Sequence, residues 1–368
     1  MAPRLLVLKD MARVMVDVIP IEPSKNASDL VPCDSASQGR EKRLPKHFLS
    51  GLLSGLANRF VVLAFLVALT FFLPRLMPGD PLDILFPGDL ARDLTPAEIA
   101  KLRHQMGLDG TLLAQFAGYC KALLQGDLGF SYIHAAPVAQ LLASSLPWTG
   151  LLMLLATPIF LVLGIGCGIE AGRQPHQLLD RTMTTIVTII ASLPPFATAV
   201  LLLVLFGFGL SLFPVSGAEP LFPSDSGARR LIDILHHAFL PATALAMHEV
   251  VRFYFLSRGE AIKLSVRPFI SNARARGVGE GREFIHYFGR NLVPTLLARL
   301  SDTISAMVTS VLFVEIVFSY PGIGNLIYNA VLDRDFALLQ GAVLGLATVV
   351  LLVNWLLDSA VAMLAERG

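Results

Sequence analysis

Charged residues are scarce in this chain. Only 15% of its 368 residues are Asp, Glu, Lys or Arg, whereas a soluble domain has about 25%. Hydrophobic residues make up 54%, and the mean hydropathy is +0.64. This balance indicates a lipid environment rather than one large water-soluble core. The net charge of +1 gives no indication of a nucleic-acid partner.

Cysteine clusters and nucleotide motifs are also lacking. The three cysteines are scattered and have no metal-ligand spacing, so they predict neither a disulfide framework nor a metal site; they are Cys33, Cys120 and Cys167. No Gly-Lys-Ser/Thr of a P-loop occurs. We therefore expect no cofactor on this chain.

Histidines give no better case for a metal site or an enzyme. On one helix His237 and His248 would lie about 16 Å apart, which is too far to share one ion. His248 and Glu249 begin an H-E-x-x-H pattern, but position 252 is Arg rather than the second histidine. The sequence therefore argues against an intramembrane metalloenzyme, and we expect no enzymatic activity.

Long apolar runs, in contrast, are abundant. A helix that crosses a bilayer needs about 20 mostly apolar residues. Six runs qualify, near 57–77, 146–169, 182–212, 238–257, 300–320 and 336–360. The fourth is the weakest, because His248, Glu249 and Arg252 interrupt it. The predicted fold class is all-α, a polytopic membrane protein with six transmembrane helices.

The distribution of Lys and Arg predicts the orientation of these spans. Residues 257–299 carry eight Lys or Arg against three acids, and residues 1–59 carry nine against six. Residues 77–146 carry four against seven. Both termini and the loop 258–299 are therefore expected in the cytoplasm, and the segment 78–145 outside.

The amino-terminal segment 1–47 has little periodicity and contains Ser, Pro, Asn and Gly. It lacks the apolar core and cleavage site of a signal peptide. We expect a disordered cytoplasmic extension, with a misassigned start as the alternative. The predicted membrane domain is 48–368.

The loop 258–299 is too long for a simple connection. Val266, Phe269, Ile270 and Ala273 recur at helical spacing. Glycines at 277, 279 and 281 then end the helix, and a second helical stretch follows. The G-x-G-x-G spacing has no strand before it, so it does not fit the dinucleotide fingerprint.

A series of short motifs runs through most of the chain. It resembles the membrane permeases of ATP-binding-cassette importers, in particular the dipeptide/oligopeptide/nickel branch. The motifs are LPRLMPGDP at 73–81, MGLD at 106–109, GDLGFS at 126–131, Leu146-Pro147, SLPPF at 192–196, NARARG at 272–277, EIVFSYPGIG at 315–324, and Asn354 with Asp358. They follow the family order from about 60 to 364.

The chain departs from the family at a few positions. Ser271 and Asn272 replace the glutamate and first alanine that name the EAA motif, although the peptide branch often lacks that glutamate. His248 and Glu249 stand where the family usually has apolar residues. The long amino-terminal segment is unusual for the family. None of these departures contradicts the resemblance.

The resemblance implies a type I importer permease fold with a cytoplasmic coupling helix, located in a bacterial inner membrane. Its implied partners are a second homologous permease, two ABC ATPase subunits that bind ATP, and an extracytoplasmic substrate-binding protein. The coupling helix would seat in the ATPase through Ser271, Asn272, Ala273, Arg274, Ala275, Arg276, Gly277 and Pro294.

Physical reasons support this assignment. Small residues allow a close backbone approach, and Gly277 can adopt the positive φ that ends a helix. Arg274 and Arg276 could bond partner carboxylates, or they could extend to lipid headgroups.

Ionisable residues inside spans are candidates for the translocation path. We predict a path or gate formed by His248, Glu249, Glu315, Ser319, Pro321 and Gly322. Glu315 could line the path or hold a bond between helices. Glu249 could line a cavity or pair with Arg252. Asn354 and Asp358 are expected to bond between helices.

The expected substrate is a peptide, with nickel or a metal chelate as the alternative for the same architecture. A secondary transporter without an ATPase is the alternative from another class. It would need coupling-ion sites and usually internal repeats, and the sequence has neither feature.

Overall fold

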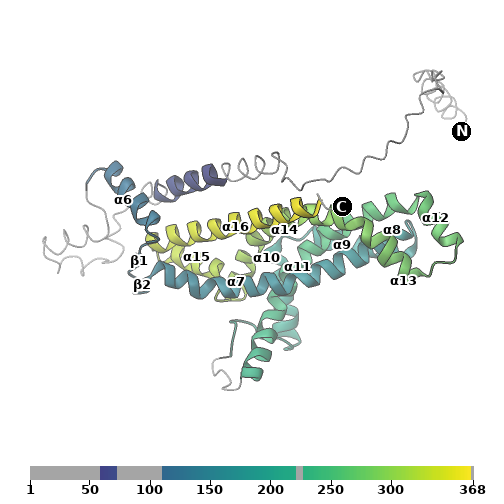
Figure 1. Cartoon of the computed structure of the whole chain (residues 1–368). Coiled ribbons are helices and arrows are strands. Elements are labelled where there is room, and N and C mark those ends of the chain that lie inside the picture. Colours follow the sequence, from purple (N-terminus) through teal and green to yellow (C-terminus); the bar gives the residue numbers. More distant parts are fainter. Residues whose placement is uncertain (1–58, 73–109, 221–226, 366–368) are drawn as a thin grey trace, which may run out of the picture. The chain divides into compact units, whose positions relative to one another are not determined.

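The computed structural model describes residues 59–72, 110–220 and 227–365. The predicted extension 1–47 and residues 78–109 of the segment 78–145 lie outside these residues. All described helices belong to one unit, residues 49–368, shown in Figure 1. Apart from one two-stranded hairpin, the regular structure in these ranges is helical, as the sequence predicts.

The first described helix, Arg59–Phe72, covers part of the first predicted span. The helix α6 (Leu112–Leu124) begins at Thr111, whose side chain accepts a hydrogen bond from the Ala114 N–H at 3.4 Å. The strands β1 (Phe130–Ser131) and β2 (Ala136–Pro137) then pair antiparallel.

A long apolar helical stretch follows the hairpin. It consists of α7 (Val138–Phe160), the π-helix η1 (Leu161–Ile165) and α8 (Gly166–Arg173). Together these form a 36-residue stretch that is long and apolar enough to cross a membrane. The predicted span 146–169 lies within it, and the helix begins earlier than we expected.

The third predicted span, 182–212, is not one uninterrupted helix. The helix α9 (Leu178–Ala191) is separated from α10 (Pro195–Leu202) and the π-helix η2 (Leu203–Gly209) by a bend of 103°. The cause is the proline pair, because Pro194 and Pro195 have no N–H to donate to the preceding turn. We call residues 192–194 the α9–α10 break.

The helix α11 (Gly227–Ser265) is 39 residues long and contains the predicted fourth span, 238–257. Between 238 and 257 most of its side chains are buried or half-buried, because it packs against α7, η1, α8 and α14. It ends just before Pro268, which disfavours helical backbone at Arg267. The short helix α12 (Pro268–Ala275) then begins with that proline at its first position.

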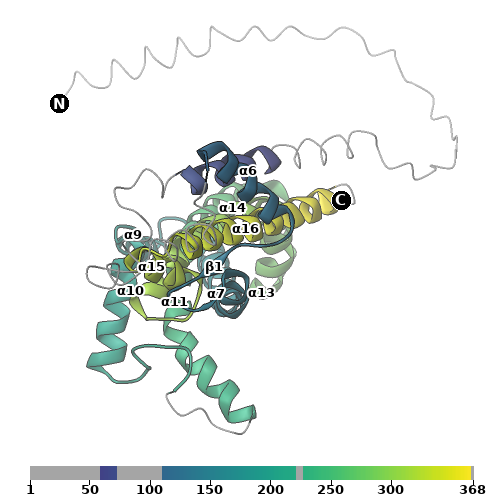
Figure 2. The ribbon, with the colours of Figure 1, turned by 90° about the vertical axis from the view of Figure 1, so that its left-hand side faces the viewer.

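The remaining helices complete the unit. The helix α13 (Glu280–Arg282) and the π-helix η3 (Glu283–Gly289) lead into α14 (Arg290–Val317). A bend of 55° separates Glu280–Leu300 from Asp302–Val317. The helix α15 (Ile323–Leu332) precedes α16 (Phe336–Ala365). Figure 2 shows β1, α15 and the beginning of α16 at one end of these helices.

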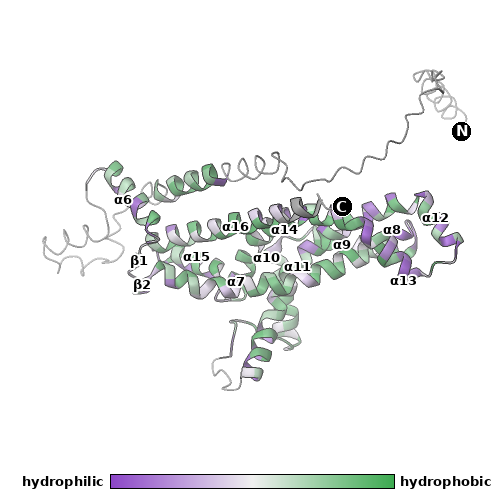
Figure 3. Ribbon diagram, viewed as in Figure 1, coloured by the Kyte–Doolittle hydropathy of each residue, from purple (hydrophilic) through white to green (hydrophobic). Residues whose placement is uncertain are grey.

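Two described stretches, Val138–Arg173 and Phe336–Ser359, are long and apolar enough to cross a membrane. The number rises to four if each bent helix pair is one span. The last predicted span is thus found, but the expected total of six is not confirmed. Figure 3 shows hydrophobic residues along the helices and hydrophilic ones concentrated on α12 and α13.

A row of glycines brings α11 close to η1 and α8. A Cβ added at Gly164 would lie 2.7 Å from the Cβ of Phe253, and one at Gly172 would lie 2.6 Å from the Cβ of Ala261. A Cβ at Gly168 would overlap the Ser257 hydroxyl. These glycines are four residues apart, so they share one helix face. Only residues without a side chain permit this approach, which fixes α11 against α8.

Candidate functional site

The end of α12 has the conformation expected from the sequence. Gly277 has a φ of +75°, in the left-handed region. Its N–H donates to the Arg274 carbonyl at 3.0 Å, and the Val278 N–H donates to the Ala273 carbonyl at 3.2 Å. These two bonds form a Schellman motif, which satisfies the last carbonyls of the helix. The predicted positive φ at Gly277 is therefore confirmed.

The two faces of α12 differ in exposure. Ile270 and Ala273 are buried against the rest of the unit. The other predicted coupling residues on this segment are exposed: Ser271, Asn272, Arg274, Ala275, Arg276 and Gly277. Pro294 lies apart from them, inside α14. The helix therefore presents a short polar surface, and Ala273 is an anchor rather than part of it.

Arg274 forms an ion pair within the chain. Its Nε and Nη2 donate to Oε1 of Glu283 at 3.1 and 2.8 Å. The Glu283 carboxylate is almost fully buried and also lies 3.8 Å from Nε of Arg173, at the end of α8. Glu283, at the start of η3, thus connects η3 to α12 through Arg274 and to α8 through Arg173. The sequence left a partner carboxylate or a lipid headgroup as the contact of Arg274; in the structure its guanidinium bonds Glu283.

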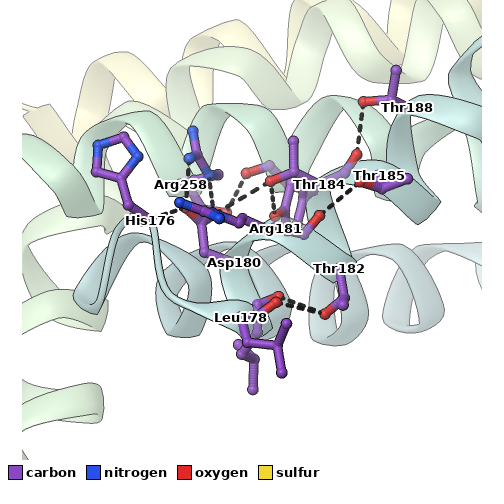
Figure 4. A network of polar contacts seen from close by, with 12 residues as sticks. His176, Leu178, Asp180, Arg181, Thr182, Thr184, Thr185, Thr188 and Arg258 are labelled. Carbon is purple, nitrogen blue, oxygen red and sulfur yellow. Dashed lines mark hydrogen bonds and ion pairs between the residues drawn. The ribbon is translucent and has the colours of Figure 1, made fainter.

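A partly buried ion pair joins the beginning of α9 to α11 (Figure 4). Asp180 accepts hydrogen bonds from Nε and Nη2 of Arg258 at 2.6 and 2.8 Å, and from the His176 N–H at 2.8 Å. Thr184, one turn later, bonds the Tyr254 hydroxyl at 2.8 Å. These bonds hold α9 against α11 near the predicted end of the fourth span.

Arg258 follows the predicted span 238–257. Its hydrogen bonds to Asp180 are the main reason that the pKa of its guanidinium is raised. The guanidinium therefore carries its charge at any physiological pH, and the pair does not act as a proton switch.

Glu315 is fully buried and connects three helices. Its Oε1 accepts from the Thr149 hydroxyl of α7 at 2.6 Å, and its Oε2 accepts from the Gly324 N–H at 2.6 Å. Thr149 in turn accepts from the Ile323 N–H at 2.9 Å. The carboxylate therefore caps the beginning of α15, where the helix dipole favours negative charge. Of the two roles left open for Glu315, these contacts support the bond between helices.

The turn after Glu315 contains three more of the predicted gate residues, Ser319, Pro321 and Gly322. Ser319 has a φ of +46° and is exposed, as is Pro321. Gly322 is buried, and a Cβ there would overlap the Glu315 carboxylate. Ser319 and Pro321 are therefore the members of this turn that a substrate or partner could reach.

His248 and Glu249 have separate environments. Nε2 of His248 lies 2.9 Å from the Leu193 carbonyl, in the α9–α10 break. The Glu249 side chain is buried and makes no hydrogen bond within the described residues. Its Oε1 lies 3.5 Å from Nη1 of Arg252, whose side chain is 55% exposed. Of the two roles left open for Glu249, these positions support the pairing with Arg252.

A polar cluster at the opposite end from α12 was not predicted from the sequence. The Ser131 hydroxyl of β1 donates to Oδ2 of Asp335, whose Oδ1 accepts from the Leu338 N–H at 3.0 Å. Asp335 therefore caps the beginning of α16 and binds the hairpin to it. The GDLGFS motif contains Ser131, so part of the signal was present in the sequence.

The polar residues of the last span bond between helices, as expected. Nδ2 of Asn354 donates to the Ser305 hydroxyl of α14 at 2.7 Å. Asp358 pairs with Arg59. Over the described ranges, His, Cys, Asp and Glu do not gather into a group of three or more that could hold a metal ion.

Comparison with known families covers most of the chain. Residues 160–367 match the family described as binding-protein-dependent transport system inner membrane component, and residues 48–153 match its amino-terminal region.

Individual relatives have related names. A Brucella abortus protein named for a peptide transport system permease is 31% identical over 83% of this chain and 95% of its own length. A Brucella suis protein named for a peptide permease is 32% identical over 88% of this chain and 98% of its own length. A Pseudomonas aeruginosa di/tripeptide transport system permease protein is 29% identical over 79% of this chain and 90% of its own length.

Proposed function

This chain belongs to the family of binding-protein-dependent transport system inner membrane components, and on that premise we propose its specific role. As a family member it is a membrane transport permease of an ATP-binding-cassette importer, not an enzyme. Such systems include an ATPase and a substrate-binding protein. We propose that it imports peptides and that α12 is the element that contacts an ATPase subunit.

The observation that carries the coupling role is the construction of α12. The helix is short, its buried face is anchored by Ile270 and Ala273, and its exposed residues after Phe269 are mostly polar. Glu283 fixes its position through Arg274. A rigid, protruding helix that is firmly attached to its own chain can transmit a displacement, whereas a flexible loop cannot. The side chain of Arg276, unlike that of Arg274, has no hydrogen bond or ion pair to another described residue, so Arg276 is the arginine that we assign to the partner.

Peptide is the substrate class that the names of the relatives favour. Nickel or a metal chelate remains the alternative substrate. We further propose that the complex contains a second permease of this family and two ATPase subunits. The charge distribution supports an orientation with α12 and both termini in the cytoplasm.

The coupling proposal is tested by Gly277→Asp. Any side chain at a φ of +75° is strained, and a bulky acidic one would also disturb the polar face of α12. We expect the variant to remain in the membrane but to lose both copurification of the ATPase and peptide-dependent ATP hydrolysis. Gly281→Asp is the matched control, because a Cβ at Gly281 meets nothing within 4 Å and its φ is not positive. Normal coupling in Gly277→Asp would refute the role of α12.

The substrate proposal is tested separately, by uptake in cells whose only importer of this family contains the chain. We expect accumulation of labelled di- to oligopeptides and none of nickel or its chelates. Accumulation of the metal alone would replace peptide by the alternative substrate.

A further inference from the structure

The α9–α10 break leaves backbone acceptors without partners. Because Pro194 and Pro195 have no N–H, the carbonyls of Ile190 and Ala191 lose their normal helical donors. The Ile190 carbonyl instead accepts from the Leu193 N–H at 3.2 Å. Among the residues that the structure describes, no donor reaches the carbonyls of Ala191 and Ser192. Two open acceptors therefore lie about a third of the way along the predicted span 182–212.

The break is also exposed on one side. Ala191, Ser192, Pro194 and Phe196 all have exposed side chains. Open backbone inside a membrane is tolerated where it is buried in protein or lines a water-filled cavity, because lipid offers no hydrogen bonds. The exposed side of the break must therefore meet water or another polar surface rather than acyl chains.

The other side of the break is held by α11. The Leu193 carbonyl lies outside both helices, and Nε2 of His248 is its hydrogen-bond partner at 2.9 Å. Since a carbonyl only accepts, Nε2 must carry the ring proton. His248 thus holds the break from the protein side and leaves the neighbouring carbonyls open.

Two further bonds prevent α9 from moving independently of α11. Arg258 binds Asp180 at the beginning of α9, and Tyr254 bonds Thr184 one turn later. His248 adds a third bond, to the Leu193 carbonyl just after the end of α9. Bonds to α11 therefore lie near both ends of α9. Because α12 follows α11 after two residues, a displacement of α12 would carry the break with it.

We propose that the α9–α10 break is a binding site on the translocation path. Its ligand is an extended peptide, whose backbone N–H groups or terminal ammonium donate to the carbonyls of Ala191 and Ser192. His248 is the positioning residue of this site. The inference rests on the proposed peptide transport and adds where the peptide binds and which of its groups are recognised. Open carbonyls of unwound helices serve a similar purpose in other transporters, where they bind cations at the bilayer midplane.

The first experiment measures water access at the break. Ser192→Cys is made in a complex whose other cysteines are replaced by alanine and whose peptide uptake has been verified. A cationic, water-soluble thiol reagent reacts with the thiolate, which forms only in contact with water. Leu352→Cys is the matched control, because Leu352 is 54% exposed on a regular part of α16. We expect labelling at position 192 to be at least tenfold faster, and a transported peptide to slow it at least threefold.

Two results would overturn the site. Labelling at position 192 as slow as at position 352 would place the break against lipid or a second subunit. Labelling that is fast but indifferent to a peptide that the same complex transports would show an aqueous surface with no peptide bound. If the complex with native cysteines transports no peptide at all, the proposed function fails instead.

The second experiment separates positioning from folding. His248→Gln retains an N–H donor for the Leu193 carbonyl, and His248→Leu removes it. We expect His248→Leu to raise the KM for peptide uptake several-fold and to abolish protection of Ser192→Cys by peptide, with His248→Gln restoring both. A merely structural role would lower the amount of complex and leave the KM and the protection unchanged in the remainder.

Discussion

Replacing Glu315 by glutamine tests whether a buried carboxylate holds the beginning of α15 in place. The carboxylate accepts from two buried donors, the Thr149 hydroxyl and the Gly324 N–H, both at 2.6 Å. A glutamine amide offers one acceptor oxygen and presents N–H groups at the other position. One buried donor therefore loses its acceptor, which costs about 1–3 kcal/mol. That cost corresponds to about a 5- to 150-fold shift of the unfolding equilibrium.

The matched control is the same substitution at Glu249. Both glutamates are fully buried, but Glu249 accepts no hydrogen bond from a described residue. It would lose only its pairing with Arg252, and since the Arg252 side chain is 55% exposed, no buried charge is left behind. Because no buried donor loses its acceptor there, we expect Glu249→Gln to cost less stability than Glu315→Gln.

Denaturant-induced unfolding of the purified complex measures both effects. Trp148 is a suitable probe, because its ring contacts Tyr320 beside Glu315 at a centroid distance of 6.0 Å. Thr149→Val combined with Glu315→Gln should cost less than the sum of the single substitutions, because the two side chains share one hydrogen bond. Equal losses for Glu315→Gln and Glu249→Gln, or strict additivity with Thr149→Val, would refute the capping role.

Two further predictions concern the packing of α11. Asp180→Asn should lower the stability by about 3 kcal/mol in the same unfolding assay, because it leaves the Arg258 charge partly buried and unpaired. Adding Arg258→Gln should recover part of this loss. An absence of recovery would contradict the ion-pair account. Gly168→Ala should cost about 1–3 kcal/mol of stability, since the added methyl overlaps Ser257. Gly166→Ala should be neutral or slightly stabilising, because its added methyl meets nothing within 4 Å. Equal amounts of folded protein in the membrane for the two variants would contradict this expectation.

The parts of the structure that the sequence predicts well depend on local features. The span 336–360 is found as α16 because its apolar run is uninterrupted. The end of α12 is found because a glycine is the residue best suited to a positive φ there. The pairing of Glu249 with Arg252 follows from their spacing on one helix.

The α9–α10 break was missed for a different reason. Hydropathy stays high through Pro194 and Pro195, so composition alone gives one clean span. The proline pair itself was the available signal, since two adjacent residues without an N–H interrupt a helix.

Other features depend on contacts between distant segments. Glu283 meets Arg274 nine positions away and Arg173 on another helix, and Asp180 meets Arg258 across 78 positions. Nothing in local spacing predicts such pairs. For Arg274 the sequence left a partner carboxylate or a lipid headgroup as its contact, while the fold supplies an anion from its own chain.

Only two residues connect α11 to α12. The direction in which α12 points therefore depends on the number of residues in α11 as well as on their identity. One added residue in a helix turns everything after it by about 100° and advances it by about 1.5 Å. An insertion within α11 after Arg258, which is bound to Asp180, would therefore aim the exposed face of α12 in another direction without altering a single side chain on it. The number of residues between Arg258 and Pro268 therefore sets the direction in which α12 presents its exposed face to a partner.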